Sequence, residues 1–174
     1  PLKRLEKKEL EFYRHWYYNA IRSIIGICNF KDDYLGLAEA CTPLITEKQA
    51  KEAVNLLAAL KMIKQDEGGF WRVTDTFVST GGNWRSEAVS SFQKETLSLA
   101  KESLDRHHAS LRDISTVTMT FNIDEISLIR EKIKEFRTEL LRMSQEGSND
   151  NAVFQLNVQM FPLAIVKKMK EKSS

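Results

Sequence analysis

The sequence predicts an α+β protein in which a winged helix, made of three helices and a β-hairpin, precedes a helix-strand-helix-strand domain. Three observations predict it: a helix-start signal at Thr46, a turn signal at residues 66–69, and a change between helical and alternating periodicity after residue 84. The chain has 174 residues, enough for one domain of typical size or two small ones.

The segment from Thr46 to Asp75 is the most informative part of the chain. Thr46 and Gln49 have the spacing of a capping box, which predicts a helix start. The apolar positions that follow recur at helical spacing: Ala50, Ala53, Val54, Leu57 and Leu60. Ile63 then begins a short strand that turns at 66–69 and returns through 70–74. A helix followed by a hairpin is the second half of a winged helix, a fold that reads DNA in many proteins and docks protein in others.

Two earlier helices complete the predicted winged helix. The first is expected over residues 7–25, with Gly26 and Asn29 at its exit. The second follows Asp32-Asp33 and ends before Thr42-Pro43, because the residue before a proline avoids the helical conformation.

A polar, glycine-containing stretch at 79–83 predicts a linker between two domains, 1–78 and 84–166. An amphipathic helix is expected over 84–108, and a basic tail over 167–174. Between these, residues 112–121 and 152–161 alternate apolar and polar side chains, which predicts two strands. Asn122 and Glu125 predict the start of a long helix that joins the strands and ends near 147–150.

Two strands alone make a poor sheet, so the second domain suggests a homodimer in which a partner chain supplies further strands. The polar face of the predicted sheet would present uncharged side chains that can hydrogen-bond: Thr116, Thr118, Thr120, Gln155, Asn157 and Gln159. A sheet face in contact with water is one interpretation of this pattern, and a site for an unknown small-molecule effector is the other.

The charge balance gives little support to nonspecific DNA binding. The net charge is +2, and residues 1–80 contain 12 Lys or Arg against 11 Asp or Glu. Side chains of the third helix and the hairpin are nevertheless candidates for contacts with duplex DNA: Lys48, Gln49, Lys51, Asn55, Lys61, Lys64 and Arg72. Glu47 and Glu52 on the same helix would repel phosphates, so a solvated or protein-docking surface is the alternative.

Aromatic residues crowd the first helix at Tyr13, Trp16, Tyr17 and Tyr18. Each step along a helix rotates by about 100°, so these side chains cannot all face one core. Tyr13, Tyr17 and Tyr18 are therefore candidates for an inter-domain or dimer interface, with partial burial beneath loops as the alternative.

The sequence offers no motif for catalysis, a cofactor or a metal: it has no phosphate loop, no G-x-S-x-G and no HExxH. His107 and His108 are adjacent and His15 is alone, so we expect exposed side chains rather than ligands. Cys28 and Cys41 are expected to be buried free thiols. Without an apolar run long enough for a membrane span or a secretory leader, a cytoplasmic location is expected.

Several segments together resemble the bacterial family named domain of unknown function 4423. They are residues 12–22, 44–46, 70–74, 111–115 and 155–163, so the resemblance covers nearly the whole chain. It implies that the chain, which begins with Pro1, follows a helix-turn-helix of the phage-repressor kind in a longer protein. It therefore implies a bacterial transcription regulator and offers no catalytic residues. The alternative is a protein-interaction module whose winged helix does not bind DNA.

Overall fold

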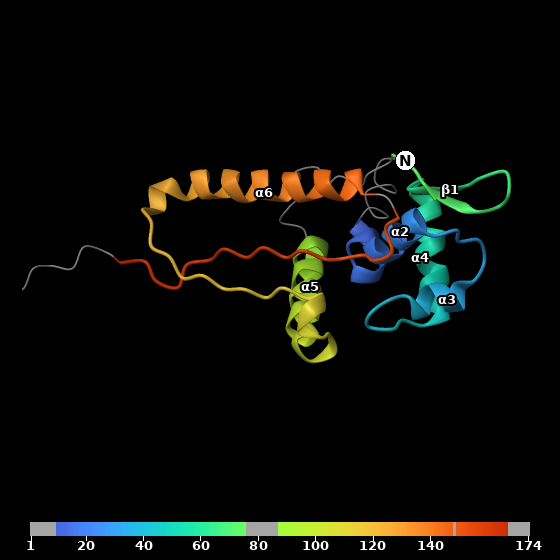
Figure 1. Cartoon of the computed structure of the whole chain (residues 1–174), viewed down its shortest axis with the longest axis horizontal. Coiled ribbons are helices and arrows are strands. Elements are labelled where there is room, and N and C mark those ends of the chain that lie inside the picture. Colours follow the sequence, from blue (N-terminus) through green and yellow to red (C-terminus); the bar gives the residue numbers. More distant parts are fainter. Residues whose placement is uncertain (1–9, 76–86, 148, 167–174) are drawn as a thin grey trace, which may run out of the picture.

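The computed structural model describes residues 10–75, 87–147 and 149–166 (Figure 1). These residues form helices and one small antiparallel sheet of two strands, so the predicted α+β class is confirmed. The predicted linker at 79–83 and the basic tail at 167–174 lie outside the described residues.

The expected first helix is interrupted. Residues 10–12 are helical, residues 13–15 form a turn, and α2 covers Trp16–Ile27. His15 precedes α2 in an extended conformation without a cap from its own side chain. Glu95, 79 positions away, supplies the acceptor instead, because its carboxylate receives the backbone N–H of Trp16 at 2.7 Å. A carboxylate at a helix amino terminus also interacts favourably with the helix dipole.

The next two helices begin at the caps that the sequence predicts. α3 (Tyr34–Glu39) starts after Asp33, whose side chain accepts from the amide of Gly36 at 2.9 Å. α4 (Glu47–Ala59) starts with both halves of the capping box: Thr46 Oγ1 accepts from the Gln49 amide, and Gln49 Oε1 accepts from the Thr46 amide. Local hydrogen bonding therefore determines where both helices begin.

The hairpin pairs β1 (Ile63–Gln65) with β2 (Trp71–Val73) in antiparallel register, with Lys64 opposite Arg72. Its turn is held by Asp66, whose Oδ1 accepts from the amides of Gly68 and Phe70 at 3.0 and 2.9 Å. Gly69 has φ +79°, a conformation that a residue with a Cβ rarely adopts. The turn is therefore fixed by a carboxylate and a glycine.

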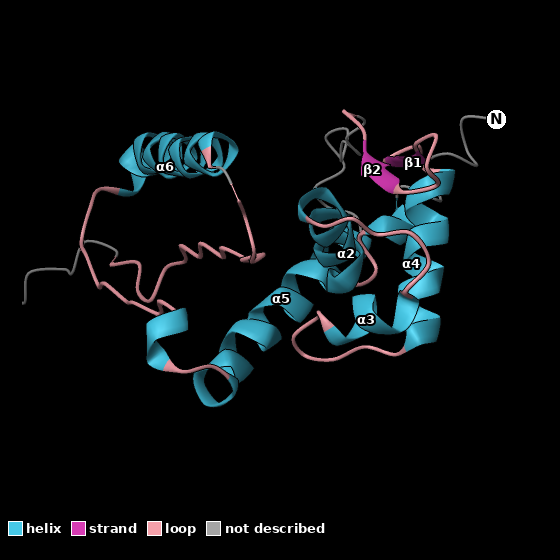
Figure 2. Ribbon diagram, turned by 45° about the vertical axis from the view of Figure 1, so that its right-hand side comes forward, coloured by secondary structure: helices cyan, strands magenta, loops and turns pink. Residues whose placement is uncertain are grey.

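One hydrophobic core unites α2, α3, α4 and the hairpin. Its fully buried side chains include Ile21 and Ile25 of α2 and Val54 and Leu57 of α4. Burying an aliphatic side chain of this size contributes about 1.5–3 kcal/mol relative to exposure. Figure 2 shows these elements gathered together, with the hairpin at one end of α4.

The second half contains α5 (Glu87–Arg106), η1 (Ala109–Leu111), η2 (Ile123–Glu125) and α6 (Ile126–Glu146). Tyr13 makes an edge-to-face contact with Phe92, which packs α5 against the residues just before α2. α6 has no buried residue, and Figures 1 and 2 show it away from α2, α3 and α4. Asn122 accepts from the Asp124 amide, so the predicted start signal caps η2, which leads into α6.

The predicted strands at 112–121 and 152–161 are wrong for the single chain. Both segments run without strand pairing, and the described part of the chain offers them no ladder partner. Alternation of apolar and polar side chains favours an extended conformation, but a strand also requires a neighbour for its main-chain hydrogen bonds. The helix-strand-helix-strand domain is therefore not present in the described residues as predicted.

No helix in the described ranges has both the length and the apolar content needed to cross a membrane.

The hairpin turn gives a test of the local fold. Gly69→Ala should lower the free energy of unfolding by about 1–2 kcal/mol, because alanine is strained at positive φ. Gly26→Ala is the matched control: Gly26 is helical, and an added Cβ would make an ordinary contact with Val73 at 3.4 Å. Urea unfolding should show that this control is neutral or stabilising, and equal losses in both variants would contradict the assigned turn.

Candidate nucleic-acid interface

The exposed side of α4 is the candidate interface. The opposite side is buried through Ala50, Ala53, Val54 and Leu57, so the orientation of the helix is fixed by the core. The candidate residues Lys48, Lys51 and Asn55 are exposed. Their spacing of three and four places them in one stripe along α4, directed away from the core.

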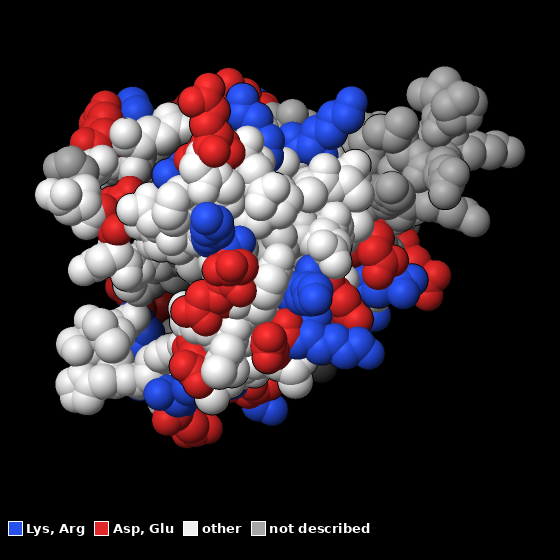
Figure 3. Space-filling view, turned by 90° about the vertical axis from the view of Figure 1, so that its right-hand side faces the viewer, with Lys and Arg blue, Asp and Glu red and all other residues white. Residues whose placement is uncertain are grey.

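Acidic residues lie beside this stripe. The ammonium of Lys48 is 3.8 Å from a carboxylate oxygen of Glu52, and both side chains are largely exposed. An exposed pair of this kind is weak and easily exchanged for another partner. Lys51 lies 5.8 Å from the centroid of the Tyr34 ring, which orients its ammonium. Figure 3 shows cationic and anionic side chains interspersed on the side of the molecule that the hairpin and α4 occupy in Figure 1.

Gln49 is a predicted DNA-contacting residue, but its side chain forms part of the capping box at the start of α4. Its side-chain oxygen accepts from both the amide and the hydroxyl of Thr46, at 2.9 and 3.0 Å. The side chain is half-buried at the start of α4. Bidentate contact with an adenine edge would need this oxygen and would break the capping box, so Gln49 is the weakest of the candidates.

The hairpin places two cations on one face. Lys64 and Arg72 are cross-strand partners, so both side chains project from the face opposite that of buried Ile63. Arg72 is held by Asp66 Oδ2 and Asn29 Oδ1, each at 2.9 Å, and lies over the Phe70 ring. This fixes its guanidinium while about two fifths of its side chain remains exposed.

Lys61 lies between α4 and β1 and has φ 60°. Its carbonyl accepts from the hydroxyl of Thr74 at 2.6 Å, which ties the end of α4 to the chain after β2. The Lys61 side chain is exposed. The predicted candidates thus fall into two groups: Lys48, Lys51 and Asn55 on α4, and Lys61, Lys64 and Arg72 at the hairpin.

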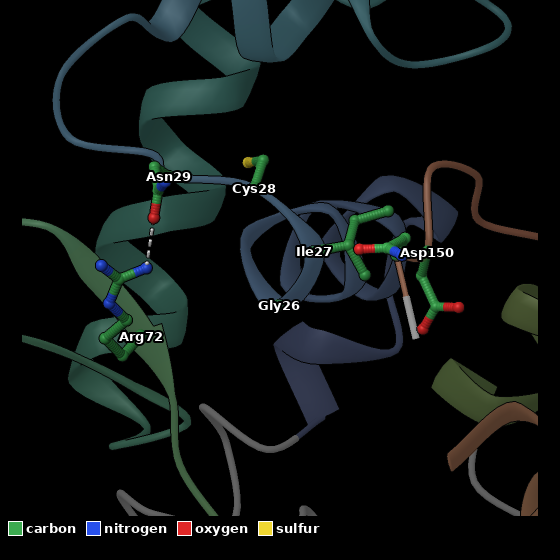
Figure 4. A pocket seen from close by; sticks show the side chains of 7 residues that line it. Gly26, Ile27, Cys28, Asn29, Arg72 and Asp150 are labelled. Carbon is green, nitrogen blue, oxygen red and sulfur yellow. Dashed lines mark hydrogen bonds between the residues drawn. The ribbon is translucent and has the colours of Figure 1, made fainter. Parts of the chain in front are cut away.

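An open hollow of about 360 Å³ lies beside Arg72, between the end of α2 and the chain after α6. In Figure 4, Arg72 turns toward Asn29, and Asp150 lies on the other side, beyond Ile27. The hollow therefore brings together one immobilised cation and one distant carboxylate. This arrangement contains no pair of groups suited to proton transfer.

The predicted aromatic interface is largely internal. Tyr17 and Tyr18 are 5% and 6% exposed and belong to the core, so they are not available to a partner chain. Burial raises the pKa of both phenols. Successive aromatics can both be buried because α2 has neighbours on two sides, α4 and α5. Tyr13 is half-buried against Phe12 and Phe92.

The predicted ligand face does not form in the single chain, because its two strands are not paired. Thr116 and Thr118 are exposed. Asn157 instead donates from its side chain to the carbonyl of Thr96 at 2.9 Å, which attaches the last extended segment to α5. Gln155 donates to the Asn157 side chain at 3.2 Å, and Gln159 is exposed.

The remaining titratable side chains do not converge. The residues that the structure describes hold no group of three or more His, Cys, Asp or Glu that could bind a metal. His15 lies 3.5 Å from a Glu95 oxygen. Cys41 is buried as expected, whereas Cys28 is exposed because it follows the last turn of α2 at the rim of the hollow.

Sequence reasoning missed two long-range contacts: Glu95 to the start of α2, and Asn157 to Thr96. No local signal identifies either. Glu95 resembles any exposed carboxylate of an amphipathic helix, and Asn157 is one of several uncharged polar residues at alternating positions.

The chain belongs to the family described as Domain of unknown function (DUF4423), whose model matches residues 1–163. The match supports the resemblance drawn from the sequence. Comparisons with curated proteins and with solved structures returned no match.

Asp66 gives a pH test of the hairpin. Hydrogen bonds from the Phe70 amide and Arg72 hold the pKa of this carboxyl below its ordinary value of 3.8. The pKa of Asp66 is lower in the folded state than in the unfolded state. The ionised carboxylate therefore stabilises the fold fully above the unfolded pKa, and this stabilisation is lost as the pH falls through the folded pKa. The stability advantage of the natural protein over Asp66→Asn should therefore shrink below about pH 4.

Urea unfolding at several pH values measures this difference in free energy, with Glu67→Gln as the control in the same turn. A difference independent of pH would contradict the assignment.

Proposed function

We propose that residues 10–75 are a winged helix that binds duplex DNA, and that the chain is part of a cytoplasmic, non-enzymatic bacterial transcription regulator that functions as a homodimer. The observation that supports this best is the position of the α4 stripe. Lys48, Lys51 and Asn55 project from the helix that immediately precedes the hairpin, which is the recognition helix of a winged helix. Asn can bond adenine edges, and Lys can contact phosphate or guanine.

Two further features support the winged-helix interpretation. The amide of Trp71 donates to the carbonyl of Phe30 at 2.8 Å, so the chain between α2 and α3 lies beside β2, where a winged helix has its third strand. Lys64 and Arg72 share the outer face of the hairpin, the part that serves as the wing. A cationic helix stripe beside a cationic wing suits a polyanion.

A second candidate function is a docking surface for another protein, without DNA binding. The observation that favours it is the charge balance of α4, whose exposed side has Glu47 and Glu52 as well as Lys48 and Lys51. Mixed charges of this kind suit a partner with a complementary pattern better than a uniform polyanion. An effector that binds the second half of the chain remains part of the main proposal, with the polar residues of 116–120 and 155–159 as its candidates.

Charge reversal on α4 tests the proposal. In the full-length protein, Lys48→Glu with Lys51→Glu should weaken binding to a mixed-sequence DNA duplex. If both lysines contact phosphates, the slope of log K against log salt should fall in magnitude by about 2. Fluorescence anisotropy over a salt series measures both quantities.

The matched control is Lys94→Glu with Lys101→Glu, two exposed side chains of α5, which changes the net charge equally. This control should retain the salt slope of the natural protein. Equal weakening in both double variants would show a general charge effect and contradict a specific role for α4. Binding to DNA that is unaffected by the α4 variant would place DNA recognition outside this helix, and would favour protein docking by α4.

A further inference from the structure

Two extended segments of the second half have no strand partner among the residues that the structure describes. Residues 113–121 and 151–161 make no backbone–backbone hydrogen bond with any other described residue. Both are bounded by regular structure: the first joins η1 to η2, and the second follows α6. An extended chain in this state exposes a row of donors and acceptors that readily pair with another strand.

The side chains of these segments are those of buried strands. Residues 114–121 and 151–161 contain no charged residue and no proline. Val117, Met119 and Phe121 alternate with threonines, and Leu156 and Val158 alternate with Asn and Gln. Natural proteins protect free strand edges with charges, proline or bulges. These segments lack such charges and prolines, which indicates that they are covered in the assembled protein.

The helix between them has an apolar stripe that the described residues cover only in part. Ile126, Ile129, Ile133, Phe136, Leu140 and Met143 recur at helical spacing, yet none is buried. Phe136 and Met143 are 49% and 56% exposed. Apolar side chains aligned along one side of a helix normally face a core. Exposed apolar side chains on the helix and unpaired backbone in the two segments therefore occur next to each other in the chain.

We propose that a second copy of this chain completes this region, by pairing its extended segments with residues 113–121 and 151–161 to form one sheet across the dimer, on which the apolar stripes of both α6 helices pack. This inference rests on the proposed homodimer and specifies its interface; it does not depend on DNA binding. Within the described residues of each copy, the two segments have no strand partner and α6 is incompletely covered, so a two-fold assembly satisfies the same need in both. Two segments from each chain give four strands, enough for a stable sheet with one apolar face.

The available surface is sufficient for such an interface. Val117 is 74% exposed, and Phe154 and Leu156 are 75% and 49% exposed. Covering the apolar side chains of the two segments and α6 would remove on the order of 1,000 Å² per chain, whereas a standard stable interface buries about 800 Å² per partner. Apart from Asp113 at one end, the two segments carry no charge, so pairing them avoids the desolvation cost that charged strands would bring.

Analytical ultracentrifugation with paired variants tests the interface. Met119→Glu with Val158→Glu places two charges on the apolar face, and Thr118→Glu with Gln159→Glu places the same charges on the polar face. The natural protein and the polar-face variant should sediment as dimers. The apolar-face variant should dissociate with a Kd raised at least about 100-fold, because its charges would be buried between chains.

A monomeric natural protein would overturn both the proposed dimer and this interface. A dimer that tolerates the apolar-face charges, or that both variants disrupt equally, would overturn this interface while leaving homodimerisation in place. DNA binding is measured separately, so its failure does not decide this question.

Amide hydrogen exchange of the natural protein provides a second measurement that does not depend on the folding of any variant. Pairing across the dimer predicts slowed exchange in residues 113–121 and 151–161, and loss of this protection on dilution to monomer. Exchange at unprotected rates in the dimer would overturn the interface. Protection that persists in a monomer would show that another part of the same protein covers the segments, and would overturn it as well.

Discussion

Burial of one side of α4 is the constraint on which the rest of the structure depends. Val54 and Leu57 are fully buried, and they pack in the same core as Ile21 and Ile25 of α2. Because this side faces the core, the stripe with Lys48 and Asn55 must face outward. The same core positions the hairpin through Met62 and Ile63, so the cationic groups of α4 and the hairpin are placed by apolar packing rather than by their own contacts.

Main-chain hydrogen bonding divides the chain into two parts. In the first half, Asp33, Thr46 and Asp66 each satisfy amides within four residues, so helices and the turn close locally. In the second half, the described residues give the extended segments no such main-chain partners, and the side chain of Asn157 attaches one of them to α5. The two parts therefore have separate proposed functions: DNA binding in the first half and dimerisation in the second.

The elements that the sequence predicted well are those with local causes. The start of α4, the cap at Asp33 and the turn at Asp66 each follow from side chains that bond neighbouring amides. Sequence reasoning failed where residues far apart in the chain determine the structure: Glu95 caps the start of α2, and Tyr17 and Tyr18 are buried in a core that several elements share. Alternation predicted extended chain at 112–121 and 152–161, but no local pattern supplies a strand partner. For the candidate interface, helical spacing places Lys48, Lys51 and Asn55 in one stripe on α4, while the side-chain oxygen of Gln49 is used by the capping box that the sequence also predicted.

The most direct test of the central claim is the free energy of unfolding of Leu57→Ala in urea, compared with Leu44→Ala, which removes the same atoms from a side chain that is 72% exposed. If the buried side of α4 organises the fold, Leu57→Ala should cost about 2–5 kcal/mol, because it leaves a cavity in the core. Leu44→Ala should change the free energy by less than about 0.5 kcal/mol. Similar small costs for both variants would contradict the account, since α4 would then not be held by the packing that directs its candidate residues outward.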